Sequence, residues 1–368
     1  MEFNKLCEYF EKLESTQSRL NKIKIIEEYI EETKNILDFS IPILEGKIIP
    51  PWSSQKLGVS KKILLKCLET LYGLDKNVIE EEFRKKGDVG LVAESLVDKK
   101  TQQTLASFSN KKNISVKNVF DNIKKLPTIE GSNAVNQKIS LISELISNSN
   151  GKEAKYIMRI INGDTRMGVS TGTIRDAIAE SLFPKIIGLR DKDEEFDENC
   201  NILYVKSLDN IKGINTNDYD LIKPKDYQTA RDCFNYITES LQSAYDKINE
   251  MRKITNLVLK GGLKEIENVS LELMVPFKVM LMQKVKSIKE ASENIDLPFY
   301  LEYKYDGFRA QVHKKGDKIK IFTRNLEDVT EQFPDVVSNL RVAIKIENVI
   351  LDGEFVGVDK KGNYLPFQ

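Results

Sequence analysis

The chain has 368 residues, 40% of them hydrophobic and 30% charged, a globular composition with length for two or three domains that excludes disordered and fibrous proteins. Its 56 basic residues balance 56 acidic residues, so a polyanion would have to bind to a segregated basic surface rather than to an overall excess of positive charge. Four scattered cysteines, Cys7, Cys67, Cys200 and Cys233, form no CxxC pair, which argues against a zinc ribbon or a disulfide framework.

The sequence contains neither a membrane span nor a signal peptide. No run of about 18 apolar residues occurs, and the amino terminus, MEFNKLCEYFEKLEST, places acids within its apolar pattern. We therefore expect a soluble, intracellular protein of the cytoplasm.

Helical periodicity dominates residues 1–268. In LNKIKIIEEYIEETK the isoleucines recur at near three- and four-residue spacing, and similar amphipathic stretches follow at 137–149 and 229–251. Short breakers separate such stretches, at Pro50-Pro51 and at residues 85–90, 126–133 and 162–168. The pattern predicts an all-α domain of many helices, in which the acidic stretch 190–199 is a solvated loop.

After residue 268 the pattern changes to short strands. PFYLEYKYD, RAQVHKK, KIKIFTRN and NVILDGEFVGVD are rich in Val, Ile, Tyr and Phe and are bounded by Gly, Asp and Asn. They predict a second, α+β domain over 269–368. Within it, LEYKYDGFR at 301–309 is expected to be a strand that enters a tight bend at Asp306-Gly307. The single histidine, His313, is expected to be exposed at a strand end.

Basic residues around the expected bend are candidates for chemistry. Lys304, at a strand end beside a bend, can project into a cleft, and a lysine that is partly desolvated beside another cation becomes a nucleophilic amine. Gly307 would let the backbone bend tightly. The planar fork of Arg309 suits a phosphate or a ribose hydroxyl, and Arg324, at the end of FTR, can reach an anionic substrate.

Two carboxylates share one face of the last predicted strand. Period-two geometry places Asp352 and Glu354 together, with Leu351 and Phe355 opposite. Two such carboxylates suit Mg²⁺ or a ribose. A turn-forming role explains Asp352 equally well, so only Glu354 is retained as a candidate ligand.

Several motifs together resemble one known family. In order and spacing, EYKYDGFRAQVH, IFTRNLEDVT and ILDGEFVGVD resemble the first three nucleotide-binding motifs of ATP-dependent DNA ligases. KxDG alone is shared with RNA ligases, capping enzymes and NAD-dependent ligases. In addition, GKIIPPWSSQKLGVSKKILLKCL, KKGDVGLVAESL and EAKYIMRIINGDTRMGVSTGTIRDAIAE resemble the helical DNA-binding domain of archaeal and eukaryotic replicative ligases. That domain is absent from capping enzymes and NAD-dependent ligases.

The resemblance implies an enzyme that seals nicks in duplex DNA during replication, repair and recombination, with ATP and Mg²⁺. Lys304 would attack the α-phosphate of ATP and form a lysyl-AMP intermediate. Glu302 would hold the adenine amino group, and Arg309 the ribose or a phosphate. Glu354 would hold the ribose and help to place the metal, while Arg324 would meet the 5′-phosphate of the nick. We expect a monomer associated with the nucleoid; whether a sliding clamp is a further partner stays open.

The stretch NGDTRMGVSTGT at 162–173 is the candidate for contact with the DNA backbone. Glycines and small hydroxyls at helix starts can present N–H groups to phosphates. The surrounding residues 152–190 hold seven Lys or Arg against four acids. The candidates are Arg166, Gly168, Thr171 and Thr173, with ordinary helix capping as the competing interpretation.

The sequence departs from the family pattern at its carboxyl end. It stops 64 residues after Lys304, before the later lysine motifs and the OB-fold of a complete ligase, so we expect the adenylation domain to be incomplete. Two functions stay open: the amino-terminal part of an ATP-dependent ligase, whose activity in this chain is an open question, and a non-catalytic fragment that binds nicked DNA. The helical domain disfavours an RNA ligase or a capping-type nucleotidyltransferase.

Overall fold

The protein divides into two compact units. The computed structural model describes residues 1–103, 114–189, 199–279, 284–295, 298 and 300–366. The first unit, here called the helical unit, comprises Met1–Pro50, Gln55–Tyr245 and Glu250–Val269. The second, here called the sheet unit, comprises Pro51–Ser54, Asp246–Asn249 and Ser270–Gln368.

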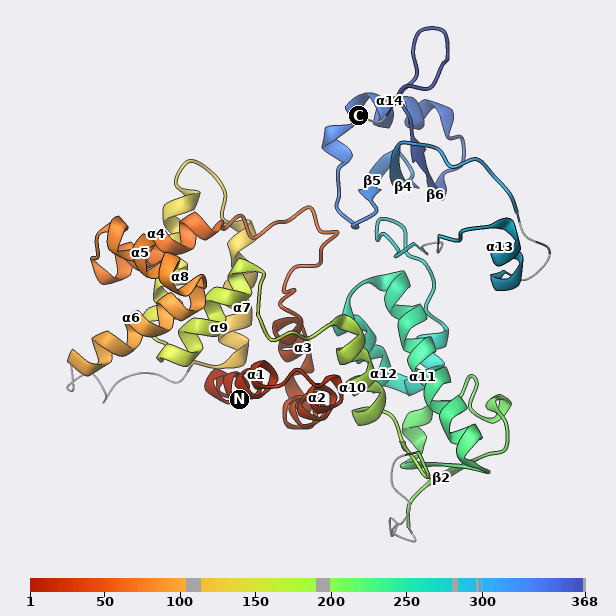
Figure 1. The fold of residues 1–368 in the computed structure, drawn as a ribbon, viewed down its shortest axis with the longest axis horizontal. Helices are drawn as coiled ribbons and strands as arrows, with labels where there is room; N and C mark the ends of the chain where they lie inside the picture. The colour runs from red at the N-terminus through yellow and green to blue at the C-terminus, as the bar shows by residue number, and fades with distance from the viewer. Residues whose placement is uncertain (104–113, 190–198, 280–283, 296–297, 299, 367–368) are drawn as a thin grey trace. The chain divides into compact units, whose positions relative to one another are not determined.

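Helices form most of the chain before residue 270 (Figure 1). They are α1 Phe3–Ser15, α2 Arg19–Thr33, α3 Leu37–Glu45, α4 Lys61–Tyr72, α5 Lys76–Lys86, α6 Val89–Gln103, α7 Val116–Lys125, α8 Ala134–Ser147, α9 Gly151–Asn162, α10 Thr171–Ser181, α11 Tyr227–Ile248 and α12 Met251–Glu267. Short 3-10 turns lie at Lys34–Ile36, Leu126–Thr128, Leu208–Asn210 and Thr216–Asp218. The helices predicted from LNKIKIIEEYIEETK and from the amphipathic stretches 137–149 and 229–251 are confirmed as α2, α8 and α11.

Local sequence signals set the ends of α9. At its start the Asn150 side chain accepts the N–H of Glu153, and the Glu153 carboxylate accepts the N–H of Asn150, each at 2.9 Å. This reciprocal cap satisfies two N–H groups that the helix itself cannot bond. At its end Gly163 is left-handed, with φ +76°, as is common where a helix stops. The loop that carries the predicted DNA contacts therefore begins at a fixed point.

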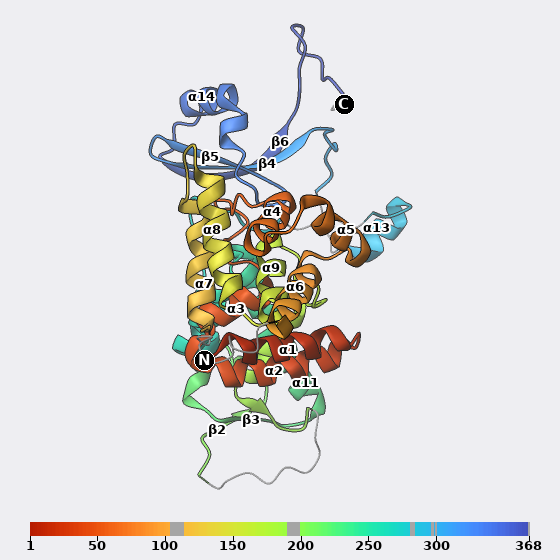
Figure 2. The ribbon, with the colours of Figure 1, turned by 90° about the vertical axis from the view of Figure 1, so that its left-hand side faces the viewer.

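Aromatic packing joins the first two helices to α9. Phe10 of α1 lies edge-on to Tyr156 of α9, with ring centroids 5.1 Å apart, and 6.1 Å from Tyr29 of α2. All three side chains are fully buried. Figure 2 shows α1 and α2 side by side. The core of the helical unit thus links its amino terminus to residues about 150 positions further along the chain.

The prediction of an all-α first domain is wrong in one respect, because the helical unit also contains a small sheet. β1 Lys185–Ile186, β2 Ile202–Val205 and β3 Leu221–Pro224 form a parallel sheet of order β1-β3-β2. Strands of two to four residues are too short to show period-two alternation, and their pairing depends on distant segments. The acidic loop predicted at 190–199 lies outside the described residues except for Asn199.

The sheet unit is built on three antiparallel strands of order β5-β4-β6. β4 is Phe308–Lys315, β5 Lys318–Thr323 and β6 Asn348–Phe355, and the helices α13 Ile288–Asn294 and α14 Pro334–Ala343 and the 3-10 turn Thr330–Gln332 accompany them. One face of the sheet buries Ala310, Val312 and Ile321 against apolar residues of α14. The three strands predicted after residue 308 are confirmed.

The strand predicted over LEYKYD is not formed, since residues 300–306 have no strand structure. β4 is already paired on both sides, by β5 and by β6, and none of the described strands pairs with this segment. An alternating sequence becomes a strand only where a partner offers hydrogen bonds. Tyr300, Leu301 and Tyr303 are consequently 101%, 92% and 89% exposed.

His313 is buried, so the prediction of an exposed histidine is wrong. Its Nδ1 accepts the N–H of Met274 at 3.1 Å, and the neighbouring Gln311 exchanges hydrogen bonds with the backbone of Phe277. Residues 274–277 therefore cover the polar face of β4 at this point. Burial, followed by the charge of Lys320, lowers the pKa of His313 to about 4, so the imidazole is neutral near pH 7.

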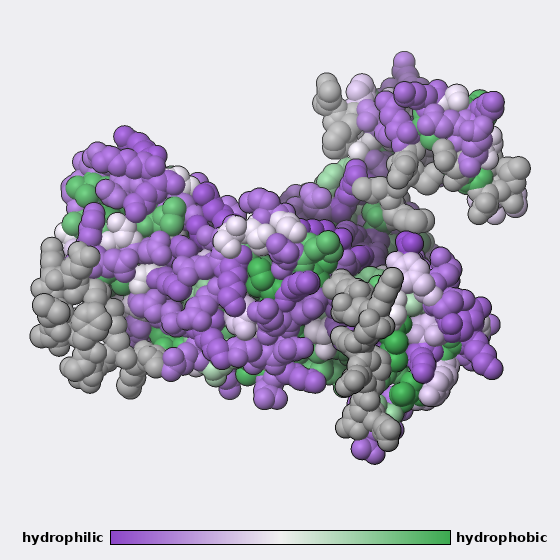
Figure 3. Space-filling model, turned by 60° about the horizontal axis from the view of Figure 1, so that its bottom comes forward, coloured by the Kyte–Doolittle hydropathy of each residue, from purple (hydrophilic) through white to green (hydrophobic). Residues whose placement is uncertain are grey.

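The surface of the helical unit is mainly hydrophilic on the face drawn in Figure 3, where hydrophobic residues form small separate patches. Among the described residues no helix combines the length and apolar character needed to cross a lipid bilayer. Scattered exposed apolar side chains of this kind are normal for a globular protein.

Candidate functional site

One end of the three-stranded sheet gathers three of the predicted residues. Arg309, near the start of β4, pairs directly with Glu354 near the end of β6. On the other side of β4, Ala310 pairs with Thr323, the last residue of β5, and Arg324 follows it in an exposed turn. Because β4 is antiparallel to both neighbours, Arg309, Arg324 and Glu354 come to the same end of the sheet.

Asp352 belongs to this group, although the sequence analysis left it out. Its carboxylate accepts two hydrogen bonds from the Arg309 guanidinium, from Nη2 at 2.7 Å and from Nε at 3.2 Å. The hydrogen bond to Asp352 raises the pKa of Arg309, and the charge of Glu354 adds to the effect. The contact is diagonal across the β4–β6 ladder, within reach of a long side chain. The shared face of Asp352 and Glu354 was the sequence signal that pointed to it.

The KYDG turn is anchored at the same end of the sheet by Gly307. A Cβ added at Gly307 would lie 2.4 Å from the Phe355 carbonyl oxygen and 3.0 Å from the Glu354 side chain. Only glycine lets the two backbones approach so closely. The Tyr305 ring also lies edge-on to the Tyr364 ring, with centroids 5.9 Å apart. The turn that follows Lys304 is thus fixed to the end of β6.

The two predicted residues that precede the bend, Lys304 and Glu302, lie on the surface. Lys304 is exposed, and Glu302, two residues earlier, is exposed as well. None of the strand pairings in the described chain brings Glu302 to the sheet end, whereas Arg309, Arg324 and Glu354 meet there through strand pairing. Lys304 is joined to that group through Tyr305 and Asp306, the two residues that lead to Gly307.

Replacing Gly307 with alanine is expected to separate β4 from β6 at this end. The added methyl would overlap the Phe355 carbonyl, and such overpacking costs about 1–3 kcal/mol. Hydrogen exchange followed by mass spectrometry should show faster exchange of the amides at the start of β4 and the end of β6. Gly353→Ala is the matched control, because a Cβ at Gly353 in β6 meets nothing within 4 Å. Equal exchange in the two variants would contradict the close approach assigned to Gly307.

The carboxylates of this end fit a divalent metal only in part. Mg²⁺ is commonly held by one or two carboxylates together with substrate phosphates, and Asp352 and Glu354 lie on one sheet face. Asp352 is already paired with Arg309, which leaves Glu354 as the carboxylate better suited to a metal. Within the described chain no three His, Cys, Asp or Glu residues group as a metal site.

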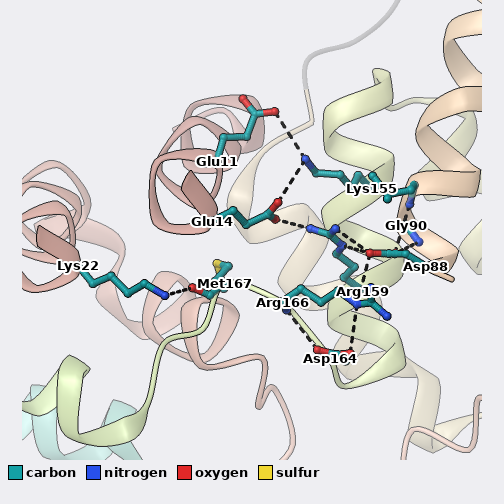
Figure 4. Close-up of polar contacts among 11 residues, drawn as sticks. Glu11, Glu14, Lys22, Asp88, Gly90, Lys155, Arg159, Asp164, Arg166 and Met167 are labelled. Atoms are coloured by element: carbon teal, nitrogen blue, oxygen red, sulfur yellow. Dashed lines mark hydrogen bonds and ion pairs between the residues drawn. The ribbon is translucent and has the colours of Figure 1, made fainter. Parts of the chain in front are cut away.

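The second candidate site is the loop between α9 and α10, where Arg166 is held by several acceptors (Figure 4). Its Nη2 donates to the Gly87 carbonyl at 2.8 Å, and its Nε lies 3.3 Å from Asp164 and 3.4 Å from Asp88. Arg166 has a positive φ of 57°, uncommon for a non-glycine residue. Its side chain remains 45% exposed, so the guanidinium is both anchored and accessible.

A buried ion-pair network supports this loop from below. Asp88 accepts hydrogen bonds from Arg159 Nε at 2.9 Å and Nη2 at 2.7 Å, and Arg159 also bonds to Glu14 of α1. Burial alone would raise the pKa of the Asp88 carboxyl, but the hydrogen bonds and charge of Arg159, with the N–H groups of Gly90 and Leu91, lower it below the usual value. The network joins α1, α9 and the start of α6.

The threonines predicted to meet DNA differ in exposure. Thr171 is the first residue of α10, half-buried, and its Oγ1 lies 3.5 Å from Lys47 Nζ. Thr173 is buried: its hydroxyl lies 2.9 Å from that of Ser170, and its N–H is capped by the Ser170 side chain. Helix capping, the competing interpretation in the sequence analysis, therefore describes Thr173.

Comparisons with known proteins agree with this two-part architecture. Residues 2–179 match the family model described as DNA ligase N terminus, and residues 279–368 match the model described as ATP dependent DNA ligase domain. The first match contains the loop at Arg166 and the second contains Lys304 and the sheet end. Together they define a nucleotidyltransferase domain that follows a ligase-type helical domain.

Archaeal relatives align with the whole chain. It is 32% identical to a DNA ligase of Nanoarchaeum equitans, 29% to one of Sulfolobus acidocaldarius and 29% to one of Archaeoglobus fulgidus. The alignments cover 100% of this chain and 54–55% of the relatives. The chain therefore belongs to the ATP-dependent DNA ligase family, and it spans about half the length of the curated relatives that it matches.

Proposed function

We propose that the protein acts in sealing nicks in duplex DNA through a covalent lysyl-AMP intermediate. The observation that carries the proposal is the KYDG turn, which the close approach at Gly307 holds against the polar end of a sheet within the segment that matches an ATP-dependent ligase domain. The family implies ATP as the substrate and a divalent metal. We infer that the protein works as a monomer in the cytoplasm, at the nucleoid; binding to a sliding clamp would be an additional interaction.

In the proposed reaction, Lys304 first loses a proton to water. Its Nζ then attacks the α-phosphorus of ATP, so that a phosphorus–nitrogen bond forms while the bond to the β-phosphate oxygen breaks, pyrophosphate leaves and Nζ gives a second proton to water. A 5′-phosphate oxygen at the nick next attacks the phosphorus of the bound AMP and displaces the lysine, which regains both protons. Finally the 3′-hydroxyl attacks that phosphate, gives up its proton and releases AMP.

The other residues of the sheet end bind and orient the nucleotide in this proposal. The Arg309 fork, held by Asp352, would face the ribose or a phosphate, and Arg324 would meet the 5′-phosphate. Glu302 would accept from the adenine amino group. Glu354 would bind the ribose and share in holding Mg²⁺, which when bound screens the negative charge of the phosphates.

One observation favours a second candidate function. Lys304 is exposed, and a lysine in water keeps its proton and is a poor nucleophile, which favours a chain that binds nicked DNA without sealing it. A sealing assay separates the two functions: a labelled nicked duplex is incubated with ATP and Mg²⁺, and joined strands are resolved on a denaturing gel. Both this chain and the complete product of the reading frame that contains it should be assayed. If neither protein joined the strands while both still bound the nicked duplex, the ligase proposal would be excluded and the binding function would remain.

The helical unit is expected to bind duplex DNA mainly through phosphates, with little sequence preference. We propose direct contacts from Arg166, the Gly168 backbone and Thr171, while Thr173 would act through the cap of α10. Neutralising a handful of phosphates gives a log–log dependence of affinity on salt with a slope of roughly −3 to −6. Fluorescence anisotropy with two nicked duplexes of unrelated sequence, over a salt series, measures this slope. A flat response, or strong discrimination between the two sequences, would count against phosphate binding.

A further inference from the structure

A buried lysine lies beneath the loop that is proposed to meet DNA. Lys22 of α2 is 6% exposed, and its Nζ donates to the Met167 carbonyl oxygen at 2.8 Å (Figure 4). It also donates to the Gly168 carbonyl oxygen at 2.9 Å. Within the described chain no carboxylate forms an ion pair with it. Burying an ammonium without an opposite charge is costly even when carbonyls satisfy its hydrogens. Its hydrogen bonds to the two loop carbonyls therefore offset only part of the cost of burial.

Lys22 fixes the direction of two peptide groups in the loop. In a trans peptide the carbonyl and the following N–H point in opposite directions. Because the carbonyls of Met167 and Gly168 point toward Lys22, the N–H groups of Gly168 and Val169 point away from it. Neither N–H donates a hydrogen bond to the described parts of the chain. Gly168 is exposed, so the two donors are presented on the side of the loop opposite the lysine.

Glycine is required at position 168 for this arrangement. Gly168 has a φ of +62°, and an added Cβ would lie 2.5 Å from Lys22 Nζ. The left-handed backbone and the close approach of the ammonium are thus two separate reasons for glycine. Helix α2 is also tied to α10 through an ion pair between Arg19 and Asp176. The loop and the helix that follows it are therefore held by the same element.

Positive partial charge lies close to the two donors. They stand just before Ser170, the cap of α10, and the amino-terminal N–H groups of that helix carry the positive end of its dipole. Lys47, whose side chain is 42% exposed and which pairs with Glu45 at 3.2 Å, reaches Thr171 at the first position of the helix. The buried charge of Lys22 adds to this potential from below, and a phosphate on the outer side would offset it.

We propose that Lys22 is a positioning residue for DNA binding: without touching DNA, it aims the N–H groups of Gly168 and Val169 at a backbone phosphate and adds an uncompensated positive charge beneath them. The inference rests on the proposed function, because it names a residue that sets up the same phosphate contact. It gives helix α2 a role in DNA binding, which an inspection of the exposed residues alone would miss because Lys22 is buried.

The test compares Lys22→Met with Lys138→Met in the whole chain. Lys138 of α8 is a matched control: it is 8% exposed, its Nζ donates to the Leu57 carbonyl at 2.9 Å, and it lies against Gly58 as Lys22 lies against Gly168. Both variants are expected to lower the thermal stability of the helical unit to a similar degree. Only Lys22→Met should weaken the binding of nicked duplex, by about tenfold to a hundredfold, as expected for losing one or two hydrogen bonds to a charged group. Equal affinities for wild type and Lys22→Met would overturn the inference and leave the proposed function standing.

Amide NMR provides a readout that a purely structural role would not change. With ¹⁵N-glycine and ¹⁵N-valine labels, the Gly168 and Val169 signals should shift when nicked duplex, or inorganic phosphate alone, is added to the wild type, and should not shift in Lys22→Met. If phosphate shifts them but DNA does not bind, the positioning role stands and the DNA-binding proposal fails. If neither phosphate nor DNA shifts the two signals, the positioning role and the proposed phosphate contact are both overturned. Should Lys22→Met not fold, Lys22→Gln keeps one donor for the carbonyls and should give the same pattern with a smaller loss.

Discussion

Replacing Lys304 with alanine is expected to abolish formation of the covalent adenylate while leaving DNA affinity unchanged. Removing a catalytic nucleophile typically costs about three orders of magnitude or more in rate, whereas the proposed DNA contacts lie in the helical unit, around Arg166. Lys304→Arg should fail as well, because a guanidinium stays protonated and cannot attack phosphorus. Mass spectrometry of the intact protein, after incubation with ATP and Mg²⁺, measures the added AMP. The assay is made on the complete product of the reading frame.

The matched control for this result is Lys315→Ala, at the far end of β4. Lys315 is exposed and pairs with Asn348 and Lys318 in the two strand ladders, away from the sheet end that carries Arg309. It should be adenylated like the wild type. An undiminished adenylate in Lys304→Ala would show that another residue is the nucleophile, while a loss in both variants would indicate damage to the sheet rather than to the chemistry.

Replacing Asp88 with alanine is expected to destabilise the helical unit by about 3–5 kcal/mol, because it removes one partner of a buried ion pair. Asp88 is 3% exposed and bonds to Arg159, which is 4% exposed, so among the described residues the guanidinium would keep Glu14 as its one carboxylate partner. The cap on the N–H groups of Gly90 and Leu91 would also be lost. Urea unfolding followed by far-ultraviolet circular dichroism measures the change.

An exposed acid of the same cluster serves as the control. Asp164 also bonds to Arg166, but its side chain is 57% exposed, and exposed ion pairs contribute about 0–1 kcal/mol. Asp164→Ala should therefore unfold at nearly the same urea concentration as the wild type. If the two alanine variants lost equal stability, the buried ion pair could not be what holds the start of α6 to α9.

The stabilisation by Asp88 should also depend on pH in a defined direction. Its pKa is lowered in the folded protein, from an unfolded value of about 3.9. A lowered carboxyl pKa contributes stability in full above the unfolded value and loses it as pH falls through the folded value. The stability difference between wild type and Asp88→Ala should thus be constant near neutral pH and shrink below about pH 4.

Sequence reasoning recovered the elements whose signal is local. The amphipathic helices α2, α8 and α11 follow from apolar periodicity, and β4, β5 and β6 follow from β-branched and aromatic runs bounded by turn residues. Part of the polar sheet end could also be predicted, since period-two geometry put Asp352 and Glu354 on one face. The pairing of Asp352 with Arg309 could not be predicted from the sequence, because strand register is set by contacts between segments 43 residues apart.

The failures have the same physical origin. LEYKYD has the alternation of a strand, but in the described chain it has no partner to bond with. His313 was expected at a surface because its own strand end is charged, yet residues 274–277 cover it. The strands β1, β2 and β3 are too short to carry a pattern of their own. Lys22 was not singled out at all, since nothing in α2 itself distinguishes a lysine that reaches a loop 145 positions away.

The long sequence separation of the contacts that close the helical unit has a consequence for synthesis on the ribosome. Glu14 meets Arg159, and Lys22 meets Met167, each pair 145 residues apart. At about 5–20 residues per second, α1 and α2 emerge roughly 7–30 s before these partners exist. During that interval the apolar face of α1, with Phe3 and Phe10, has no α9 to pack against. The amino terminus is therefore the first part of the chain to be made, yet it cannot complete its packing until α9 has left the ribosome.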